Sequence, residues 1–503
     1  MQKNLIANLL CSLIVTITGV ISIPIYIKFL GTEAYGLIGF YITLNSFLSI
    51  LDMGFSATMI REMAWLSNKQ EDAQTLKNLA KTLEILFWCI AILCGILITT
   101  CSPFIAKYWI NNNSLSFDTI SRTVMLMGVS LTFHLPMALY NGGLTGLQKL
   151  IPLNIVLAVS ELTKLFVLVL TFSYKSPSIE LFFYVQIIVI TCTCLVMAFL
   201  YWKSVPKTGD KASFDKRQLV RVKNFSLGMT GISIVGVILG QMDKVVLIKL
   251  LPLKEYGYYI LAVSVASLLY KLTGPIFQTV YPRLVQLVSV RDVFIKTAYH
   301  QYCQLMAVLL LPIGITIFLF PQHIIFLWTH NFLLSKDAAP IARILIIGTT
   351  IQGMMFIPYA LQLAYGLTRL PFLINLISIC FLLPALFILT NKFGAIGGAM
   401  VWLTLNIGYL CVTIPLTHKY VLKKEMLRWY LEDTFRPAII ITGTAFFLKS
   451  TFISLDLKDN IFLSGFKIGV FIVILYLVAI LSNSFILDFF KKKLLIIKYG
   501  EKN

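Results

Sequence analysis

The chain has 503 residues, of which 58% are hydrophobic and 13% are charged, and its mean hydropathy is +0.85. Soluble domains carry about 25% charged residues, so this composition excludes a soluble globular protein and indicates an integral membrane protein. The net charge of +20 is not gathered in one basic patch, so we expect no nucleic-acid partner. The nine cysteines nearly all lie within apolar segments and are expected to be small buried side chains, not metal ligands.

Apolar segments long enough to cross a bilayer follow one another from end to end, which leaves no room for a separate soluble domain. The first follows Lys3 but has no convincing cleavage site, so we interpret it as a retained helix. The sequence therefore predicts an all-α integral membrane protein. Charge clusters and Gly, Pro and Asn residues divide it into about fourteen spans: 5–27, 36–60, 83–106, 119–141, 151–173, 179–202, 225–250, 256–281, 298–320, 339–364, 371–390, 394–418, 436–453 and 461–487.

Basic residues are distributed unevenly between the two sides of the membrane. If the N-terminus is cytoplasmic, the inside segments hold about 27 Lys and Arg and the outside segments about 11, which agrees with the excess of positive charge in cytoplasmic loops. We therefore expect a multi-pass protein with both termini in the cytoplasm. The basic stretch 203–224 is the predicted linker between two six-helix bundles, 1–202 and 225–420, and residues 421–503 add two helices and a basic tail.

Two segments about 220 residues apart are alike. IYIKFLGTEAYGLIGF, from Ile25, recurs as VLIKLLPLKEYGYYIL, from Val246. Each half holds an even number of spans, so the two copies are parallel, and such a duplication indicates a transporter with a pseudo-symmetric cleft. The matched positions keep their order: Lys28 with Lys249, Tyr35-Gly36 with Tyr256-Gly257, Pro136 with Pro358, Gly146-Leu147 with Gly366-Leu367, Lys149 with Arg369, and Asn154 with Asn375.

Several ionisable residues lie at membrane depth, where they are costly and usually face a cavity or a partner. Lys271 interrupts an otherwise apolar span too deeply to reach either surface, so we expect it to line a cavity. Asp243 follows Gly236 and Gly240, small residues that permit close helix packing. We expect Asp243 to face the bundle, where it either pairs with a Lys or Arg of a neighbouring helix or takes part in transport.

Three further residues have two interpretations each. Asp52 continues a polar face of the second span, formed by residues at helical spacing. Glu161 either neutralises Lys164, three residues along its helix, or binds an ion. His134 in the fourth span is either a helix-contact residue or part of a proton relay.

Three short motifs stand in order within the duplicated frame. They are Asp52-Met53-Gly54-Phe55 followed by Arg61-Glu62, the Lys-x-Leu…Tyr-Gly element, and Gln241-Met242-Asp243-Lys244 ahead of its second copy. Together they resemble the Wzx-type polysaccharide exporter and O-antigen flippase family, a branch of the superfamily that contains the multidrug and toxin extruders. The resemblance covers essentially the whole chain.

The resemblance implies two six-helix bundles around a central cationic cavity, with two further helices. It also implies a function in the bacterial inner membrane. An undecaprenyl-diphosphate-linked oligosaccharide, an O-antigen or capsule repeat unit, would move from the cytoplasmic to the periplasmic leaflet by alternating access.

The resemblance also suggests roles for particular residues. A proton or sodium gradient would drive transport without a cofactor or metal. The expected partners are the lipid-linked glycan, membrane lipid, a polysaccharide polymerase and assembly proteins. The candidates for binding the diphosphate are Lys271, Lys244 and Arg343, with Lys28 and Lys249 either guiding the head group or anchoring the membrane border, and the candidates for ion coupling are Asp52, Asp243, Glu161 and His134.

Two other functions compete with this one. A multidrug or metabolite cation antiporter of the same architecture would favour an acidic or aromatic cavity, whereas this chain has buried basic residues. A membrane enzyme that polymerises glycans would need a substantial external catalytic loop and a set of nucleophile, base and acid. We find neither in the sequence, so we expect no enzyme activity.

Overall fold

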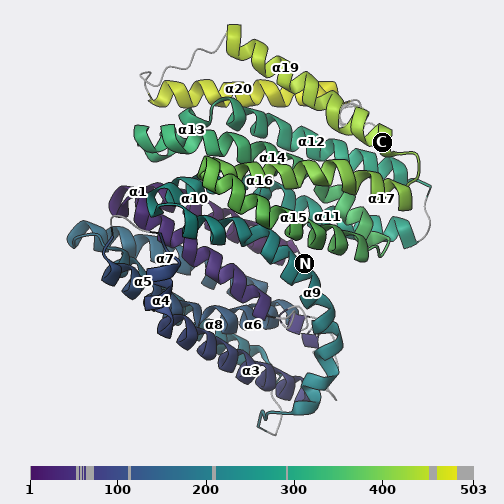
Figure 1. The fold of residues 1–503 in the computed structure, drawn as a ribbon. Helices are drawn as coiled ribbons and strands as arrows, with labels where there is room; N and C mark the ends of the chain where they lie inside the picture. The colour runs from purple at the N-terminus through teal and green to yellow at the C-terminus, as the bar shows by residue number, and fades with distance from the viewer. Residues whose placement is uncertain are drawn as a thin grey trace, which may run out of the picture. The chain divides into compact units, whose positions relative to one another are not determined.

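The computed structural model describes residues 2–52, 56, 59–60, 62–63, 73–111, 115–206, 211–289, 293–451 and 461–483. These residues form helices joined by turns and short connections, and none of them forms a strand (Figure 1). The prediction of an all-α protein is therefore confirmed. The motif residues Met53, Gly54, Phe55 and Arg61 and the basic tail after residue 483 lie outside the described residues.

The chain divides into two compact units, Met1–Gly257 and Tyr258–Asn503. This division falls after the predicted linker 203–224, because the long helix that follows the linker packs on the first helix of the chain. The predicted bundle boundaries stay a prediction. The helices of the first unit are α1 (Gln2–Leu51), α3 (Ala73–Thr100), α4 (Ser102–Tyr108), α5 (Phe117–Leu131), α6 (His134–Gly146), α7 (Leu150–Tyr174), α8 (Ile179–Ser204) and α9 (Lys216–Leu250), and α10 (Leu253–Ser267) crosses the division.

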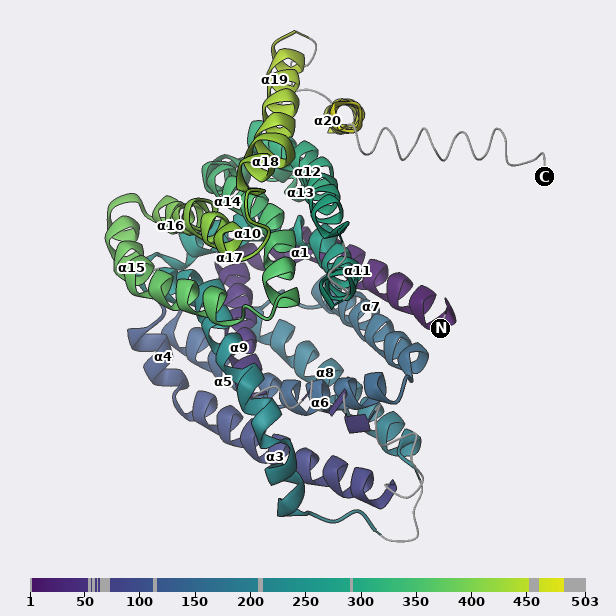
Figure 2. The same ribbon diagram turned by 90° about the vertical axis from the view of Figure 1, so that its right-hand side faces the viewer.

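The second unit contains the remainder of the repeat's second set of helices, after α9 and the start of α10, and two more helices at its end. α12 packs against α14, and α14 against α16, while α19 and α20 pack on each other and on α12, as Figure 2 shows. The helices are α11 (Tyr270–Ser289), α12 (Ile295–Leu319), α13 (Pro321–Thr329), α14 (Phe332–Ala364), α15 (Arg369–Phe393), α16 (Ala395–Gly408), the π-helical η2 (Tyr409–Thr413), α17 (Ile414–Tyr420), α18 (Met426–Arg428), the π-helical η3 (Trp429–Phe435), α19 (Arg436–Thr451) and α20 (Ile461–Ser482).

The number of membrane spans differs from the predicted fourteen. The described residues contain 10 helices that are long and apolar enough to cross a membrane, or up to 11 if the bent pair α10 and α11 is one span. α19 has only 16 residues, fewer than the roughly 20 that cross a bilayer. The count of fourteen therefore stays a prediction, whereas the multi-pass character is clear.

α1 explains part of the difference. Its apolar segment Leu13–Leu51 has 39 residues, which at about 1.5 Å per residue is almost twice the roughly 30 Å of a hydrocarbon core. Gly31 interrupts this helix with φ 85° and ψ 171°, a conformation that glycine adopts without steric cost. α1 therefore consists of two helices joined at Gly31, and they cover most of the two predicted spans 5–27 and 36–60.

The repeated Tyr-Gly element has a packing role within the first unit. A Cβ added to Gly36 would lie 2.9 Å from the Leu253 carbonyl oxygen, and one added to Gly257 would lie 2.3 Å from the Thr32 carbonyl oxygen. Thr32 and Leu253 are themselves matched positions of the repeat, so the two copies make reciprocal contacts. Glycine is required at both positions because any side chain would collide with the backbone of the other helix.

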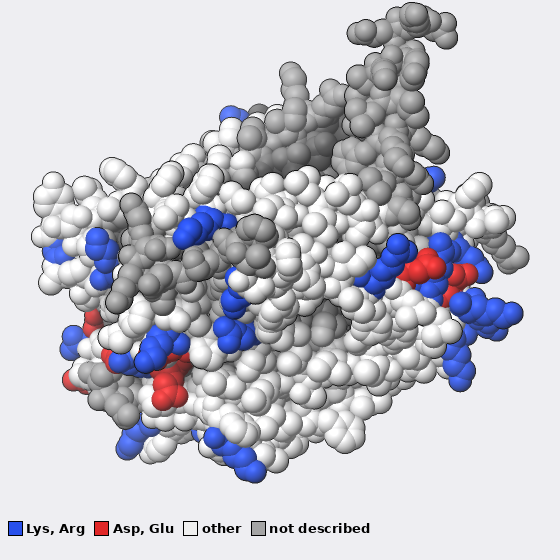
Figure 3. All heavy atoms as spheres, turned by 90° about the horizontal axis from the view of Figure 1, so that it is seen from above, with Lys and Arg blue, Asp and Glu red and all other residues white. Residues whose placement is uncertain are grey.

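Charged side chains are unevenly distributed over one face of the molecule. On the face seen in Figure 3, Lys, Arg, Asp and Glu gather toward two opposite margins, with uncharged surface between them. Many large apolar side chains are exposed, among them Phe166 and Phe381. Such exposure would be a liability in water but is expected where helices face lipid.

Candidate functional site

Lys271 lies at the start of α11, directly after a break in the helix. Together, α10 and α11 are long and apolar enough to form one membrane span, but the two helix axes differ by 42° across the break at Leu268 and Leu269. The Lys271 side chain is exposed, and no described residue makes a hydrogen bond or ion pair with its ammonium. An unpaired cation at a helix start, where backbone N–H groups also carry partial positive charge, is suited to bind an anion.

Lys244, the second cationic candidate, is already engaged. Its Nζ lies 3.2 Å from Asp243 Oδ1 and donates a hydrogen bond of 2.8 Å to the Gly240 carbonyl oxygen. Asp243 is buried, but its cationic partner among the described residues is the next residue on the same helix and not a residue of a neighbouring helix. No described atom lies within 4 Å of a Cβ built on Gly236 or Gly240, so the close approach that these glycines permit is not used by a described residue.

The other three cationic candidates are exposed and lie beside aromatic rings. Cations near ring faces at a membrane border are typical of interfacial anchors. These contacts therefore favour anchoring over substrate guidance for Lys28 and Lys249. The distances to the ring centroids are 6.0 Å for Lys28 and Phe29, 5.0 Å for Lys249 and Trp109, and 5.9 Å for Arg343 and Phe318, whose carbonyl oxygen also accepts a hydrogen bond from Arg343 Nε.

Among the coupling candidates, Asp52 forms a local contact. Its Oδ1 accepts hydrogen bonds from the Ser56 backbone N–H at 3.1 Å and from the Ser56 hydroxyl at 2.7 Å. Short polar side chains at helix ends often bind neighbouring backbone groups in this way. Asp52 thus has a structural partner, and its role in coupling stays a prediction.

Glu161 and Lys164 form the local ion pair that the sequence allowed, with Lys164 Nζ 2.6 Å from Glu161 Oε2. His134 lies in a separate polar network, in which its Nε2 is 2.8 Å from the Tyr41 hydroxyl. That hydroxyl also lies 2.8 Å from the Ser130 hydroxyl and accepts from Gln186 Nε2 at 3.4 Å. The first unit therefore holds an ion pair on α7 and a separate polar network that joins α1, α5, α6 and α8.

A buried carboxylate that the sequence reading missed lies on α3. Glu84 Oε1 accepts hydrogen bonds from the Tyr140 hydroxyl at 2.7 Å and from Trp202 Nε1 at 2.8 Å, and Glu84 Oε2 pairs with Lys81 at 2.7 Å. Glu84 and Lys81 are three residues apart at the predicted border of a span. From the sequence alone, such a pair is expected to be an ion pair on the solvent-exposed surface. The aromatic partners come from α6 and α8 and gave no signal in the sequence.

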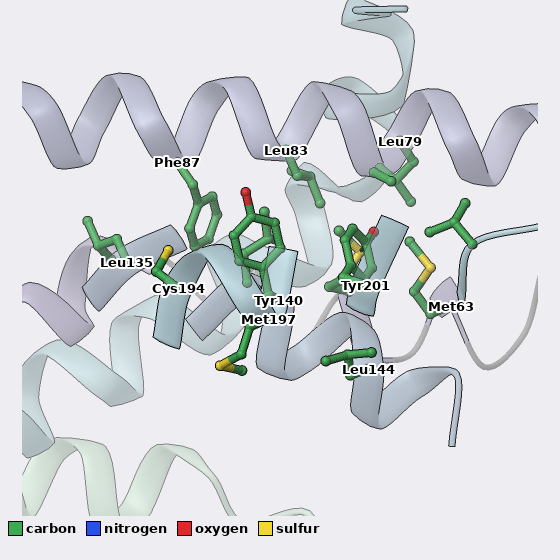
Figure 4. Close-up of a cluster of buried hydrophobic side chains, with 14 of the residues drawn as sticks. Met63, Leu79, Leu83, Phe87, Leu135, Tyr140, Leu144, Cys194, Met197 and Tyr201 are labelled. Atoms are coloured by element: carbon green, nitrogen blue, oxygen red, sulfur yellow. Dashed lines mark hydrogen bonds between the residues drawn. The ribbon is translucent and has the colours of Figure 1, made fainter. Parts of the chain in front are cut away.

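The Glu84 contacts lie along an apolar core of the first unit. Figure 4 shows Leu83 and Phe87 of α3 facing Tyr140 of α6, with Met197 and Tyr201 of α8 on the same side. Because Glu84 joins α3 to α6 and α8 at this core, we interpret it as a packing element rather than a transport group.

A second missed cluster joins α12 to the segment before α19. His300 Nδ1 lies 2.5 Å from Asp433 Oδ2, and His300 Nε2 lies 3.2 Å from Glu425 Oε2. Lys296, which bonds to Glu425 at 2.7 Å, lowers the pKa of that carboxyl, whereas burial raises the pKa of Asp433. These bonds attach the last two helices to the repeat. No group of three potential metal ligands occurs among the described residues.

The chain is similar in sequence to proteins named for polysaccharide biosynthesis and O-antigen transport. A family model described as "Polysaccharide biosynthesis protein" matches residues 1–288. A Shigella flexneri protein named "Putative O-antigen transporter" is 21% identical over 401 residues, which cover 80% of this chain and 93% of the relative.

Solved structures with the same fold include two transport proteins. The "Lipid II flippase MurJ, inward closed conformation" is 15% identical with a TM-score of 0.69, covering 98% of this chain and 100% of that one. An inward-facing multidrug resistance MATE family transporter is 14% identical with a TM-score of 0.67, covering 81% and 96%. None of these similar proteins is named as an enzyme, as expected from the sequence. Because the family model matches more than half of the residues, this multi-pass membrane chain belongs to the polysaccharide biosynthesis protein family.

Proposed function

We propose that the protein is a flippase that moves an undecaprenyl-diphosphate-linked oligosaccharide from the cytoplasmic to the periplasmic leaflet of a bacterial inner membrane. Membership of the polysaccharide biosynthesis family and likeness to an O-antigen transporter support a lipid-linked glycan as cargo. The single structural observation in favour is the unpaired, exposed Lys271 at a helix break. The polyprenyl tail can stay in lipid while the head group, which hydrocarbon excludes, passes along the protein.

The diphosphate is the part of this substrate that Lys271 would bind. A diphosphate is an anion that cannot enter hydrocarbon uncompensated, and a single ammonium supplies a compact point charge. Lys244 is a weaker candidate because Asp243 already neutralises it. Translocation would follow alternating access, coupled to a proton or sodium gradient through Glu161, Asp52, Asp243 or His134.

A cation antiporter is the runner-up, because the fold is also that of a multidrug transporter. Such a pump needs a carboxylate or an aromatic cage that attracts organic cations. The positive charge of Lys271 would repel them. The charge at this position therefore favours the anionic cargo.

The experiment replaces Lys271 with Gln in cells that depend on this protein for surface polysaccharide. Losing a bond to a charged group removes about 1.5–3 kcal/mol, so we expect surface polymer to fall at least about tenfold while lipid-linked repeat units accumulate in the cell. Lys271→Arg keeps the charge and should retain activity. Lys392→Gln, at an exposed lysine at the end of α15, is the matched control.

Protein levels in the membrane must equal those of the wild type in every strain. Normal polymer in the Lys271→Gln strain, without accumulated repeat units, would remove Lys271 from the mechanism and with it the observation on which the proposal stands.

A further inference from the structure

A pocket of about 220 Å³ lies within the second unit, where α14, α15 and η2 meet. No charged side chain lines it. Its volume is below the roughly 300–1,000 Å³ of sites for drug-sized ligands, so it has room for one small ring. Its lining combines three amides, Gln352, Gln362 and Asn375, with three aromatic rings, Phe356, Tyr359 and Tyr409.

The aromatic part of the lining belongs to a larger group of rings. Phe277 of α11 stacks on Tyr359, with centroids 6.1 Å apart and planes 21° apart, and meets Phe356 edge-on at 6.0 Å. Phe356 and Tyr359 are only half-buried, so part of each ring is open to the pocket. Aromatic rings provide large, rigid apolar contact, which suits the C–H face of a sugar.

The polar part of the lining has unused bonding capacity. Gln362 is fully buried, and its Nε2 donates to Thr417 Oγ1 at 2.5 Å, but its Oε1 has no partner among the described residues. The Thr413 hydroxyl is also buried without a partner there. A buried polar atom left unbonded costs about 1–3 kcal/mol, so both side chains would gain from turning toward a molecule in the pocket that offers hydroxyl or amide groups.

The π-helical turn η2 brings two of these groups to the pocket. It carries Tyr409 and Thr413, and the Tyr409 hydroxyl donates to Asn375 Oδ1 at 2.7 Å. This bond fixes the amide so that its NH₂ group is left to donate to a ligand. π-Helical turns within α-helices frequently occur at functional sites.

We infer that this pocket binds one uncharged sugar ring of the lipid-linked glycan, a hexose or N-acetylhexosamine, while Lys271 binds the diphosphate. The inference rests on the proposed function and names the part of the cargo that the second unit recognises. Tyr270 connects the two sites, since its hydroxyl bonds to Gln352 and its ring lies 6.4 Å from Phe356. Lys271 is the next residue along the chain.

The position of the pocket along the helices agrees with this assignment. It is lined from Gln352 to Gln362 near the end of α14 and from Pro371 to Asn375 near the start of α15, on either side of one turn. In the orientation expected from the basic residues, this turn faces the cytoplasm, where the head group would enter. An organic cation is the competing occupant, because rings also attract cations, but no lining carboxylate would neutralise it.

The test measures binding of two lipids to the purified full-length protein in nanodiscs, which avoids detergents with sugar head groups. The probes are undecaprenyl diphosphate alone and undecaprenyl diphosphate that carries a single N-acetylglucosamine or glucose. We expect the wild type to bind one glycosylated lipid at least about tenfold more tightly, the gain from one well-placed set of bonds.

The variants separate the sugar pocket from the diphosphate site. Asn375→Leu and Tyr409→Phe should reduce the preference for the glycosylated lipid below twofold and leave the affinity for the bare lipid unchanged. Lys271→Gln should weaken both lipids at least tenfold. Tyr430→Phe is the matched control, because it removes a half-buried hydroxyl bond to the Leu410 carbonyl outside the pocket.

The outcomes distinguish the two proposals. If the wild type binds both lipids equally, or if Asn375→Leu and Tyr409→Phe keep the preference, the sugar pocket is rejected and the flippase proposal stands. If the wild type binds neither lipid, the proposed function fails and the assigned ligand with it. Saturable binding of tetramethylammonium that Tyr409→Phe or Asn375→Leu abolishes would assign the pocket to organic cations instead.

Discussion

The two copies of the repeat carry different chemistry on corresponding helices. Asn154 of α7 matches Asn375 of α15, and both helices have 25 residues. Farther along, α7 carries the ion pair of Glu161 and Lys164, whereas α15 carries Leu382 at the position of the glutamate. The first unit thus keeps titratable groups on this helix, and the second keeps an uncharged pocket beside it.

A further pair of positions points the same way. Ser130 of α5 and Gln352 of α14 match in the frame of Pro136 and Pro358, and each bonds to a tyrosine hydroxyl. In the first unit that tyrosine also contacts a histidine, while in the second it borders the amide and aromatic pocket. The two tyrosines do not occupy matched positions, because Tyr41 corresponds to Ala262 in the repeat. The two contacts therefore arose separately, and the groups around them differ.

Moving the charge of the first unit into the second should have the largest effect on stability. Leu382 is buried, so Leu382→Glu places a carboxylate among apolar side chains and should destabilise the protein by about 2.5–3.5 kcal/mol. Adding Ala385→Lys restores the spacing of the natural ion pair but should recover less than half, because desolvation offsets the attraction. Folded yield and thermal unfolding in detergent measure both changes.

Leu382→Met is the control for this substitution, and it should cost less than about 1.5 kcal/mol. Full recovery of the unfolding temperature in the Leu382→Glu, Ala385→Lys double variant would mean that the two helices tolerate the same chemistry. The contrast between the units would then reflect drift and not a difference in environment.

The sequence predicted the parts of the molecule that depend on local spacing. The contact of Glu161 with Lys164 follows from helical periodicity and is present. The importance of Gly36 and Gly257 follows from their recurrence, and both contact the opposite copy closely. No described atom of another helix lies close to Gly236, because a small residue permits close packing of a second helix but does not require it.

The pocket and the buried clusters were beyond such reasoning. Tyr359 and Tyr409 are separated by 50 positions and look like ordinary apolar residues of two spans, so only tertiary packing brings them together. His300 gave no signal because its partners, Glu425 and Asp433, lie in a connection outside the repeat. A charged residue at membrane depth can be recognised from the sequence of one span. An uncharged binding site can be recognised only when the positions of several helices are known.

Removing the tyrosine hydroxyl of the first unit should have the next effect in size. Tyr41→Phe leaves the buried Ser130 hydroxyl and the His134 ring nitrogen without their partner, and such unpaired groups cost about 1–3 kcal/mol. Thermal unfolding of the purified protein measures the loss. Tyr184→Phe, at an exposed tyrosine of α8, should stay within about 0.5 kcal/mol, and an equally small change for Tyr41→Phe would contradict a structural role for this network.

The smallest effect on stability should come from the ion pair that distinguishes the first unit. Glu161 and Lys164 are 37% and 18% exposed, and pairs at this helical spacing contribute only about 0.2–0.5 kcal/mol. Glu161→Gln should therefore leave thermal unfolding almost unchanged. If Glu161 couples transport to an ion gradient, the same variant should abolish the response of translocation to an ionophore that collapses the gradient.

The combination of the two measurements gives this prediction its force, because a stability defect could otherwise imitate a transport defect. Glu180→Gln, in the first turn of α8, removes an acidic side chain that lies outside the proposed coupling set and should change neither quantity. A Glu161→Gln protein that still responds to the ionophore like the wild type would exclude Glu161. Coupling would then have to be sought at Asp52, Asp243 or His134. The pair of Glu161 and Lys164 would have no role in transport, and each residue would only neutralise the charge of the other on α7. The matched helix α15 has no charge at these positions and so needs no such pair.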